Sequence, residues 1–280
     1  MEYITIPDIY CPFPSLISPY VEKLHQHCLR FAKQFHLVQQ GKAFRHFSTC
    51  RFAWFVARVY PFAEFDDLTL IADWNCIFFL FDNQLDEGNI RKQPERIQLA
   101  IEHLIAIMSD PSITPQSPIA EAFADFWQRT VHNTNPDWQR RFIDSMAKYL
   151  FACLWQAQNH VQGHIPDVDT YVEKRRLAAA TLPVLDLIDI ALRITLPPHV
   201  YESQELQSLR LITANMVCWV NDLYSLPKEL AHGDTHNLVV ILQHAHKCSL
   251  DDAIYHTCRM IEDEVRLFID IEQHLPHFSP

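Results

Sequence analysis

Oxygen-bearing side chains recur in one stretch of the sequence at the spacing of a helix face. Asn221, Ser225 and Glu229 fall at positions i, i+4 and i+8, so in a helix they share one side. Amide, hydroxyl and carboxylate oxygens are hard ligands, and Mg²⁺ prefers such oxygens while it keeps waters and substrate phosphates in its shell. Lys228 adds a cation for an anionic group beside the metal, and Pro227 should kink the helix or end its regular part. The stretch therefore predicts a magnesium site; the alternative, an ordinary amphipathic helix, requires these three residues to align by accident.

A second polar cluster, residues 78–88, closes an apolar segment. Asp82 and Asp86 are four residues apart, so both carboxylates project from one helix face. Counting back from Asp82 in fours places Phe78 and Trp74 on that face. Carboxylates at a helix C-terminus oppose the helix dipole and need a compensating cation. The pattern indicates either an acidic pair at the mouth of an aromatic-lined surface or a solvated helix end.

The segments that must position these clusters are predicted to be helical. The chain has only 4 glycines and 17 prolines, and between the prolines apolar residues recur at three- and four-residue steps. No long linker, internal repeat or low-complexity tract divides the sequence, so we expect a single all-α domain over 1–280. The predicted helices are 19–39, 43–59, 66–87, 91–109, 117–132, 136–161, 167–180, 184–195, 203–231 and 249–274, with a short one at 235–246.

Composition excludes several classes of protein. A hydrophobic content of 49% excludes disorder, and a net charge of −11 argues against nucleic acid as a partner. No stretch reaches the roughly 20 apolar residues of a membrane span, and no signal peptide precedes the first helix, so we expect a cytoplasmic protein without a membrane partner. The 8 cysteines form no Cys-x-x-Cys pair, which favours reduced thiols over disulfides or a zinc site.

Both polar clusters resemble the metal-binding motifs of class I terpene synthases, and their separation is similar to that of the bacterial branch. Residues 221–229 match the downstream motif Asn-Asp-x-x-Ser-x-x-Lys-Glu without a gap, and residues 82–86 match the aspartate-rich motif with Asn83 in place of the second aspartate. The resemblance implies that Asn221, Ser225 and Glu229 hold one magnesium. It implies that Asp82 bridges two further ions, with Asp86 as an additional ligand.

The resemblance extends to the helix before the downstream motif. Family members use an arginine there to sense diphosphate, and Arg175, which lies 46 residues before Asn221, matches it, with Arg176 as the neighbouring alternative. The small-residue stretch 178–183 falls where the family breaks this helix to present a backbone carbonyl to the substrate. The family's last helix carries an Arg-Tyr pair, which is absent from residues 274–280; the resemblance leaves open a trimmed tail or an incomplete lid.

The resemblance implies a helical bundle around a central apolar cavity and a terpene cyclase activity. Three Mg²⁺ ions, with Mn²⁺ as a substitute, would grip the diphosphate of a linear prenyl substrate, and Lys228 and Arg175 would share its charge. We expect farnesyl diphosphate as the substrate and a sesquiterpene as the product, with the rings of Trp74 and Phe78 facing the carbocation. The expected partner is this small molecule alone, bound by a monomer or homodimer.

Three alternatives to a cyclase remain open from the sequence. A chain-elongating prenyl transferase would share the fold and metals but normally carries a second aspartate-rich box. A di-iron helical oxidase would use Glu-x-x-His pairs, and the sequence offers two, at residues 22–25 and 229–232. The third alternative is a non-catalytic helical binding protein.

Overall fold

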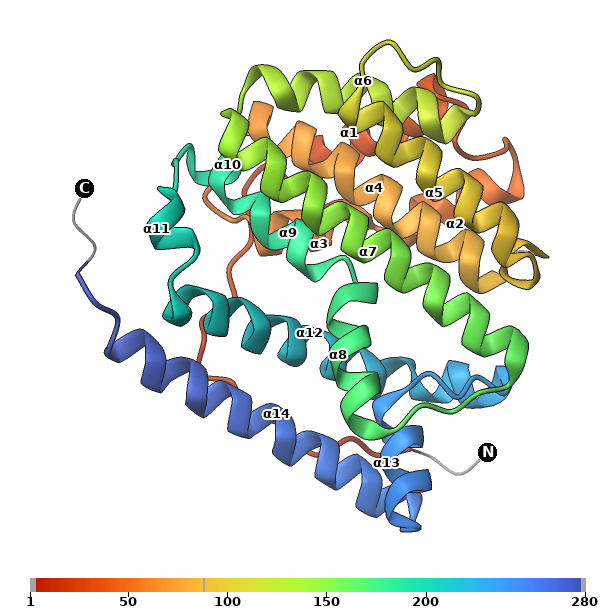
Figure 1. Ribbon diagram of the computed structural model, residues 1–280, viewed down its shortest axis with the longest axis vertical. Helices are drawn as coiled ribbons and strands as arrows, with labels where there is room; N and C mark the ends of the chain where they lie inside the picture. The colour runs from red at the N-terminus through yellow and green to blue at the C-terminus, as the bar shows by residue number, and fades with distance from the viewer. Residues whose placement is uncertain (1–3, 88, 278–280) are drawn as a thin grey trace. The chain divides into compact units, whose positions relative to one another are not determined.

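The structure, a computed structural model, describes residues 4–87 and 89–277, with the side chains of 83–89 and 91 left outside the description. Within these ranges every regular element is helical, which confirms the predicted all-α class (Figure 1). The chain divides into two compact units. Unit 1 comprises residues 1–13, 148–182 and 196–280, and unit 2 comprises residues 14–147 and 183–195. The single domain over 1–280 stays a prediction.

Unit 2 contains the aspartate-rich helix α4 and the helices packed around it. Its elements are α1 Val21–Gln34, α2 Lys42–Cys50, α3 Phe52–Val59, α4 Phe65–Glu87, the 3₁₀ turn η1 Asn89–Lys92, α5 Pro94–Ser109, α6 Pro118–His132, the first part of α7 Pro136–Gln162, and α10 Ile188–Leu192.

Trp74 of α4 lies at the centre of the unit 2 core. Its side chain is fully buried, and its ring centroid lies 4.3 Å from that of Phe126 and 4.7 Å from that of Phe142. The indole Nε1–H donates to Thr130 Oγ1 over 2.9 Å, so the polar edge of the ring is satisfied inside the core. These contacts fix α4 against α6 and α7.

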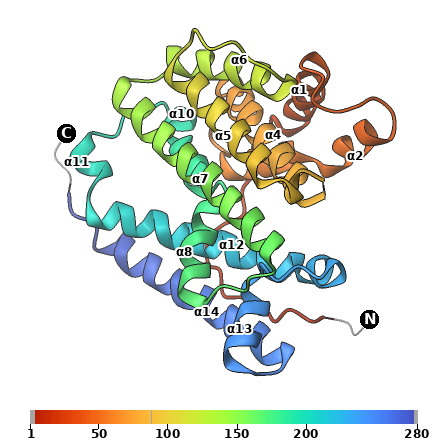
Figure 2. The same ribbon diagram turned by 45° about the vertical axis from the view of Figure 1, so that its right-hand side comes forward.

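Unit 1 contains the helix of the downstream motif. Its elements are the rest of α7, α8 Val168–Ala178, α11 Pro198–Tyr201, α12 Gln204–His232, α13 Leu238–His246 and α14 Leu250–Gln273; α9 Thr181–Asp186 contributes to both units. Helices α12 and α14 run side by side (Figures 1 and 2). Gly233 ends α12 in the left-handed conformation at φ 69°, and a capping box between Ser249 and Asp252 begins α14.

The structure differs from the predicted helices in four places. The helix expected over 43–59 is broken at Arg51, which has a left-handed φ of 53°, and the helix over 184–195 is replaced by α9 and α10. The helix over 19–39 ends at Gln34, and the short helix α11 was not predicted. Helix α12 continues past Pro227 to His232, so its regular part does not end at the proline. Leu223 and Leu226, which precede the proline, are fully buried.

None of the eight cysteines forms a disulfide. Among the described residues, no helix is both long and apolar enough to cross a membrane.

Candidate active site

The oxygen-bearing face of α12 is present as predicted from its spacing. Asn221, Ser225 and Glu229 all lie within the single helix α12; Asn221 is exposed, and the other two are partly buried. Lys228 is exposed one residue before Glu229. The three oxygen donors therefore occupy one side of a helix whose opposite side is packed in the core of unit 1.

Asp222, which follows Asn221 in the sequence, does not lie on this oxygen-bearing face. It is fully buried, and its Oδ2 accepts hydrogen bonds from the Tyr171 hydroxyl over 2.8 Å and from the Leu238 backbone N–H over 3.0 Å. Burial is the main cause, and the negative charge of Asp222 the second, of a pKa of Tyr171 that lies well above its ordinary value. The Tyr171 hydroxyl therefore keeps its proton. Asp222 thus anchors α8 and α13 to α12.

Arg175 joins the buried Asp222 to the exposed Asn221. Its Nε donates to Asp222 Oδ1 over 2.9 Å, and its Nη2 donates to Asn221 Oδ1 over 2.7 Å. Burial by itself would lower the pKa of Arg175, but the Asp222 carboxylate, together with Tyr171 and Cys218, raises that pKa well above its ordinary value. A permanently charged guanidinium therefore lies against one of the predicted metal ligands.

Arg176, the neighbouring arginine, is held by a separate chain of hydrogen bonds. Its Nε donates to Asn215 Oδ1 over 2.5 Å, and Asn215 Nδ2 donates to Glu264 Oε1 over 2.6 Å. Asn215 is only 3% exposed, so this chain links α8, α12 and α14 inside unit 1. The two arginines that the sequence left as alternatives thus have different partners, and Arg175 is the one bonded to Asn221 and Asp222.

Glu229 is held in place by Asn237, the N-cap residue of α13. Asn237 Nδ2 donates to Glu229 Oε2 over 2.7 Å and to the Asp222 backbone carbonyl over 2.6 Å. Burial raises the pKa of Glu229, while hydrogen bonds from Asn237 and Ser225 oppose that rise. Since a partly desolvated carboxylate gains from a nearby cation, this donor set fits a hard divalent metal ion.

The roles of Tyr171, Asp222 and Asn237 were not predicted from the sequence. Asn237 stands before an apolar run and after the Gly233 stop, a pattern that signals an N-cap. Nothing in the sequence signals the bond from Asn237 to Glu229, because it depends on how α13 folds back onto α12.

The acidic cluster lies on α4 in unit 2. Asp82 is exposed, and the side chain of Asp86 lies outside the described residues. Trp74 and Phe78, the predicted aromatic face, are 0% and 5% exposed and belong to the unit 2 core. The metal-binding role of the aspartates and the substrate-binding role of the rings stay predictions.

The break predicted after Arg175 is observed. Helix α8 ends at Ala178 and α9 begins at Thr181, with Ala180 in the left-handed region at φ 55°. The buried thiol of Cys218 lies 3.5 Å from the Arg175 carbonyl oxygen, and that of Cys153 lies 3.8 Å from the Ala178 carbonyl oxygen. These weak donors lie against carbonyls of the last turn of α8, whose helical partners end at the break.

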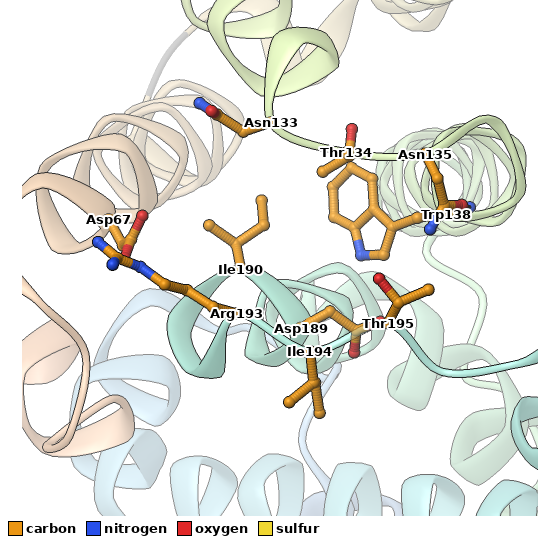
Figure 3. A pocket seen from close by; sticks show the side chains of 10 residues that line it. All are labelled: Asp67, Asn133, Thr134, Asn135, Trp138, Asp189, Ile190, Arg193, Ile194 and Thr195. Atoms are coloured by element: carbon orange, nitrogen blue, oxygen red, sulfur yellow. Dashed lines mark hydrogen bonds and ion pairs between the residues drawn. The ribbon is translucent and has the colours of Figure 1, made fainter. Parts of the chain in front are cut away.

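Unit 2 also contains a cavity of about 350 Å³ between the turn joining α6 to α7 and the residues around α10 (Figure 3). Asn133 and Thr134 bond to carbonyl oxygens of α6, and Asn135 caps α7. Arg193 pairs with Asp67 over 2.7 Å. The polar side chains named here thus bond to the backbone of a turn or helix end, or to each other. The cavity differs in this respect from the oxygen-bearing face of α12.

An all-helical fold that presents this oxygen-bearing face beside a charged arginine is what the resemblance to class I terpene synthases implied. The chain belongs to terpene synthase family 2, since the family model described as "Terpene synthase family 2, C-terminal metal binding" matches residues 73–266. The resemblance to bacterial class I terpene cyclases is thereby confirmed, and the chain is a member of an enzyme family of lyases.

Characterised relatives cover most of the sequence. The chain is 31% identical over 280 residues to germacrene A synthase of Nostoc punctiforme, covering 100% of this chain and 87% of the relative. It is 33% identical to the farnesyl-diphosphate-cyclizing (+)-T-muurolol synthase of Roseiflexus castenholzii, covering 96% and 82%. The crystal structure of germacradien-4-ol synthase from Streptomyces citricolor matches with a TM-score of 0.85 at 25% identity, covering 96% and 86%.

The di-iron alternative has no assembled site in the part of the chain that the structure describes. No group of three or more His, Cys, Asp and Glu side chains there is placed to hold a metal ion. His232 of the second Glu-x-x-His pair is exposed at the end of α12, where its Nδ1 lies 2.7 Å from the Lys228 carbonyl oxygen.

Proposed function

We propose that this protein ionises farnesyl diphosphate and cyclises the resulting cation to a sesquiterpene, with release of diphosphate and a requirement for Mg²⁺. The observation that carries the proposal is the alignment of Asn221, Ser225 and Glu229 on one face of α12, with Arg175 against it. Support for the fifteen-carbon substrate comes from the relative in Roseiflexus castenholzii, whose name specifies cyclisation of farnesyl diphosphate.

In this proposal, one magnesium is held by the Asn221 amide oxygen, the Ser225 hydroxyl and the Glu229 carboxylate. The Asp82 and Asp86 carboxylates are proposed as ligands of the other two ions, and Mn²⁺ could replace Mg²⁺. When bound, the ions stabilise the negative charge that develops on the diphosphate as the C–O bond breaks.

The chain's own residues supply three further contributions. Arg175 and Lys228 place positive charge near the diphosphate, and Asn237 orients Glu229 by its hydrogen bond of 2.7 Å. The rings of Trp74 and Phe78 are proposed to stabilise the carbocation through their π faces. Exclusion of water by the apolar walls prevents quenching of the cation before the ring closes.

The proposal is tested by incubating the protein with ten-, fifteen- and twenty-carbon prenyl diphosphates and Mg²⁺, then analysing volatile products by gas chromatography and mass spectrometry. We expect cyclic fifteen-carbon products that disappear when EDTA is added and return with excess Mg²⁺. Elongated prenyl diphosphates would instead show a chain-elongating transferase, and unchanged substrates would refute catalysis. The Ser225→Ala variant serves as a control for metal dependence. It removes one proposed metal ligand from a partly buried position on α12, so it should form cyclic products more slowly than the wild type.

A further inference from the structure

Another cavity of unit 2, of about 570 Å³, is lined by residues of α4, α5 and α6 and of the turn after α1. Helix α6 packs against both α4 and α5, and the three helices lie together in Figures 1 and 2. Four of the lining residues are buried and apolar: Phe81, Ile97, Leu104 and Ala120. Small-molecule sites are typically concave, mostly apolar and roughly 300–1,000 Å³ in volume. The cavity therefore has the size and the lining of a ligand-binding site.

This cavity is separate from the candidate metal-binding residues. Its described lining residues all belong to unit 2, whereas Asn221, Ser225 and Glu229 lie on α12 in unit 1. On α4, the cavity is lined by Phe81, the residue before Asp82. Successive residues of an α-helix point about 100° apart, so the buried Phe81 and the exposed Asp82 leave α4 on different sides. The cavity thus lies on a different face of α4 from the proposed metal ligand.

The lining indicates an uncharged ligand. Among the described residues that line the cavity there is no lysine, arginine, aspartate or glutamate. A phosphate or carboxylate group would lose its hydration in such a cavity without gaining an opposite charge, which is unfavourable. A neutral molecule with a hydrocarbon skeleton gains from the same surroundings, because its apolar surface is removed from water.

One polar atom of the lining residues lacks a partner. His103 of α5 is partly buried, and its Nε2 is buried without a hydrogen-bond partner among the described residues. A buried polar atom that has given up water without a replacement destabilises the folded state. A neutral imidazole nitrogen donates or accepts according to its tautomer, and a hydroxyl group does either. A ligand hydroxyl therefore complements His103 in both tautomers.

We propose that this cavity binds a neutral alcohol with a hydrocarbon skeleton of about ten to fifteen carbons, whose hydroxyl bonds to His103 Nε2. The skeleton packs against Phe81, Ile97 and Leu104, and burial of its apolar surface supplies most of the affinity. The hydrogen bond to His103 fixes the orientation of the ligand. The cavity takes this ligand whether or not α12 binds a metal ion, so the site is independent of the proposed function.

Helix α5 provides a blocking variant and a matched control. Ala100 lines the cavity and is exposed, so Ala100→Trp adds a large ring at the cavity without removing a core side chain. The preceding residue, Leu99, is 67% exposed and is not among the residues that line the cavity. Leu99→Trp therefore adds the same ring to another side of the same helix.

The experiment measures binding of menthol and p-menthane to the full chain by equilibrium headspace gas chromatography. The two probes share a ten-carbon skeleton and differ by one hydroxyl. We expect wild type and Leu99→Trp to bind menthol alike and Ala100→Trp to bind it at least about tenfold more weakly, since the added ring takes the space of the ligand. Menthol bound elsewhere on the chain would be unaffected by Ala100→Trp. No binding by wild type, equal binding by Ala100→Trp, or an equal loss in Leu99→Trp overturns the proposal.

A further variant, His103→Leu, tests the hydrogen bond and decides the proposal even where Ala100→Trp fails to fold. It removes the unpaired nitrogen and leaves an apolar side chain, so we expect an unchanged circular dichroism spectrum. Menthol should bind about threefold or more weakly, while p-menthane binds as before or more tightly. An equal change for both probes, as would follow if a water molecule already satisfied Nε2, overturns the proposal. The product assay with prenyl diphosphates decides the proposed function separately.

Discussion

Two adjacent residues of α12, Asn221 and Asp222, show how burial separates roles within one motif. The Asp222 carboxylate would be the stronger metal ligand by charge, yet it is fully buried and bonded to Tyr171, Arg175 and a backbone N–H. Asn221 is exposed and carries an amide oxygen on the outer face. The accessible oxygen therefore belongs to the neutral amide, and the buried aspartate holds Arg175.

The proposed ligands can be tested one at a time. We predict that Asn221→Ala, Ser225→Ala and Glu229→Ala each lower turnover at least about tenfold, equivalent to a loss of ~1.4 kcal/mol of transition-state stabilisation. The reason is that each removes one of three oxygens from the same helix face. Steady-state kinetics with saturating Mg²⁺ provide the measurement, and wild-type rates in all three variants would refute the ligand assignment.

Asn237 provides a test of ligand orientation. In the Asn237→Ser variant the hydroxyl can still cap α13, but the side chain is too short to replace the donor at 2.7 Å from Glu229. We predict that the Mg²⁺ concentration for half-maximal turnover rises about tenfold or more, since hydrogen bonds to charged groups contribute roughly 1.5–3 kcal/mol. A titration with Mg²⁺ that leaves this concentration unchanged would show that Glu229 is oriented without Asn237.

Phe78 provides a test of the aromatic face on α4. The ring is proposed to act on the carbocation after ionisation, so we predict that Phe78→Leu continues to release diphosphate but changes the product mixture. Diphosphate release and gas chromatography of the products measure the two effects separately. An unchanged product profile would assign Phe78, which is 5% exposed, to the core alone.

At the scale of elements, α8, α12 and α14 are connected by two successive hydrogen bonds, from Arg176 to Asn215 and from Asn215 to Glu264. One oxygen of Glu264 accepts from Asn215, while Oε2 is buried and has no hydrogen-bond partner among the described residues. Burial raises the pKa of Glu264, and the hydrogen bond from Asn215 and the charge of Arg176 only partly oppose this effect; Asp263 adds to the rise. Ionisation of Glu264 therefore lowers the free energy of unfolding.

This cost predicts a pH-dependent effect of Glu264→Gln, which keeps an oxygen to accept from Asn215 and removes the charge. Between the ordinary and the raised pKa the folded protein binds more protons at Glu264 than the unfolded chain, so wild-type stability falls as pH rises through that window. We predict that the variant gains stability relative to wild type as pH rises above about 4.3, the ordinary glutamate value. Urea unfolding at several pH values measures this difference, and a difference that shrinks with rising pH would contradict it.

The elements that the sequence predicted well are those with strong periodicity and clear end signals. Helices α6 and α12 begin and end within about one residue of prediction, because Ser117 and Gly233 mark their ends. The break at Arg51 was missed because a left-handed arginine carries no sequence signal of the kind that glycine provides. The face of α12 was predictable because its spacing is local, whereas the partners of Asp222 and Glu229 come from α8 and α13 and depend on tertiary packing.

At the scale of the whole molecule, the question is whether the two units unfold as one. The residues of each unit come from separate stretches of the sequence, and helices α7 and α9 each contribute residues to both. No linker separates the units along the chain, which supports the prediction of one domain over 1–280. Members of the same family match nearly the full length of the chain, so the whole length belongs to one kind of fold.

Scanning calorimetry tests this prediction together with the proposed ligands. We predict a single unfolding transition whose calorimetric enthalpy equals its van't Hoff enthalpy. Mg²⁺ with inorganic diphosphate at about 100 times the Kd should raise Tm by roughly 5–10 °C, since such binding stabilises the folded state by about 2.7 kcal/mol. The Asn221→Ala variant should keep the single transition, because Asn221 is exposed, and should lose most of the shift, because it lacks one proposed metal-binding side chain. Two transitions, of which only one moves with ligand, would instead show that the two units unfold independently and that the bound ligand stabilises one of them alone.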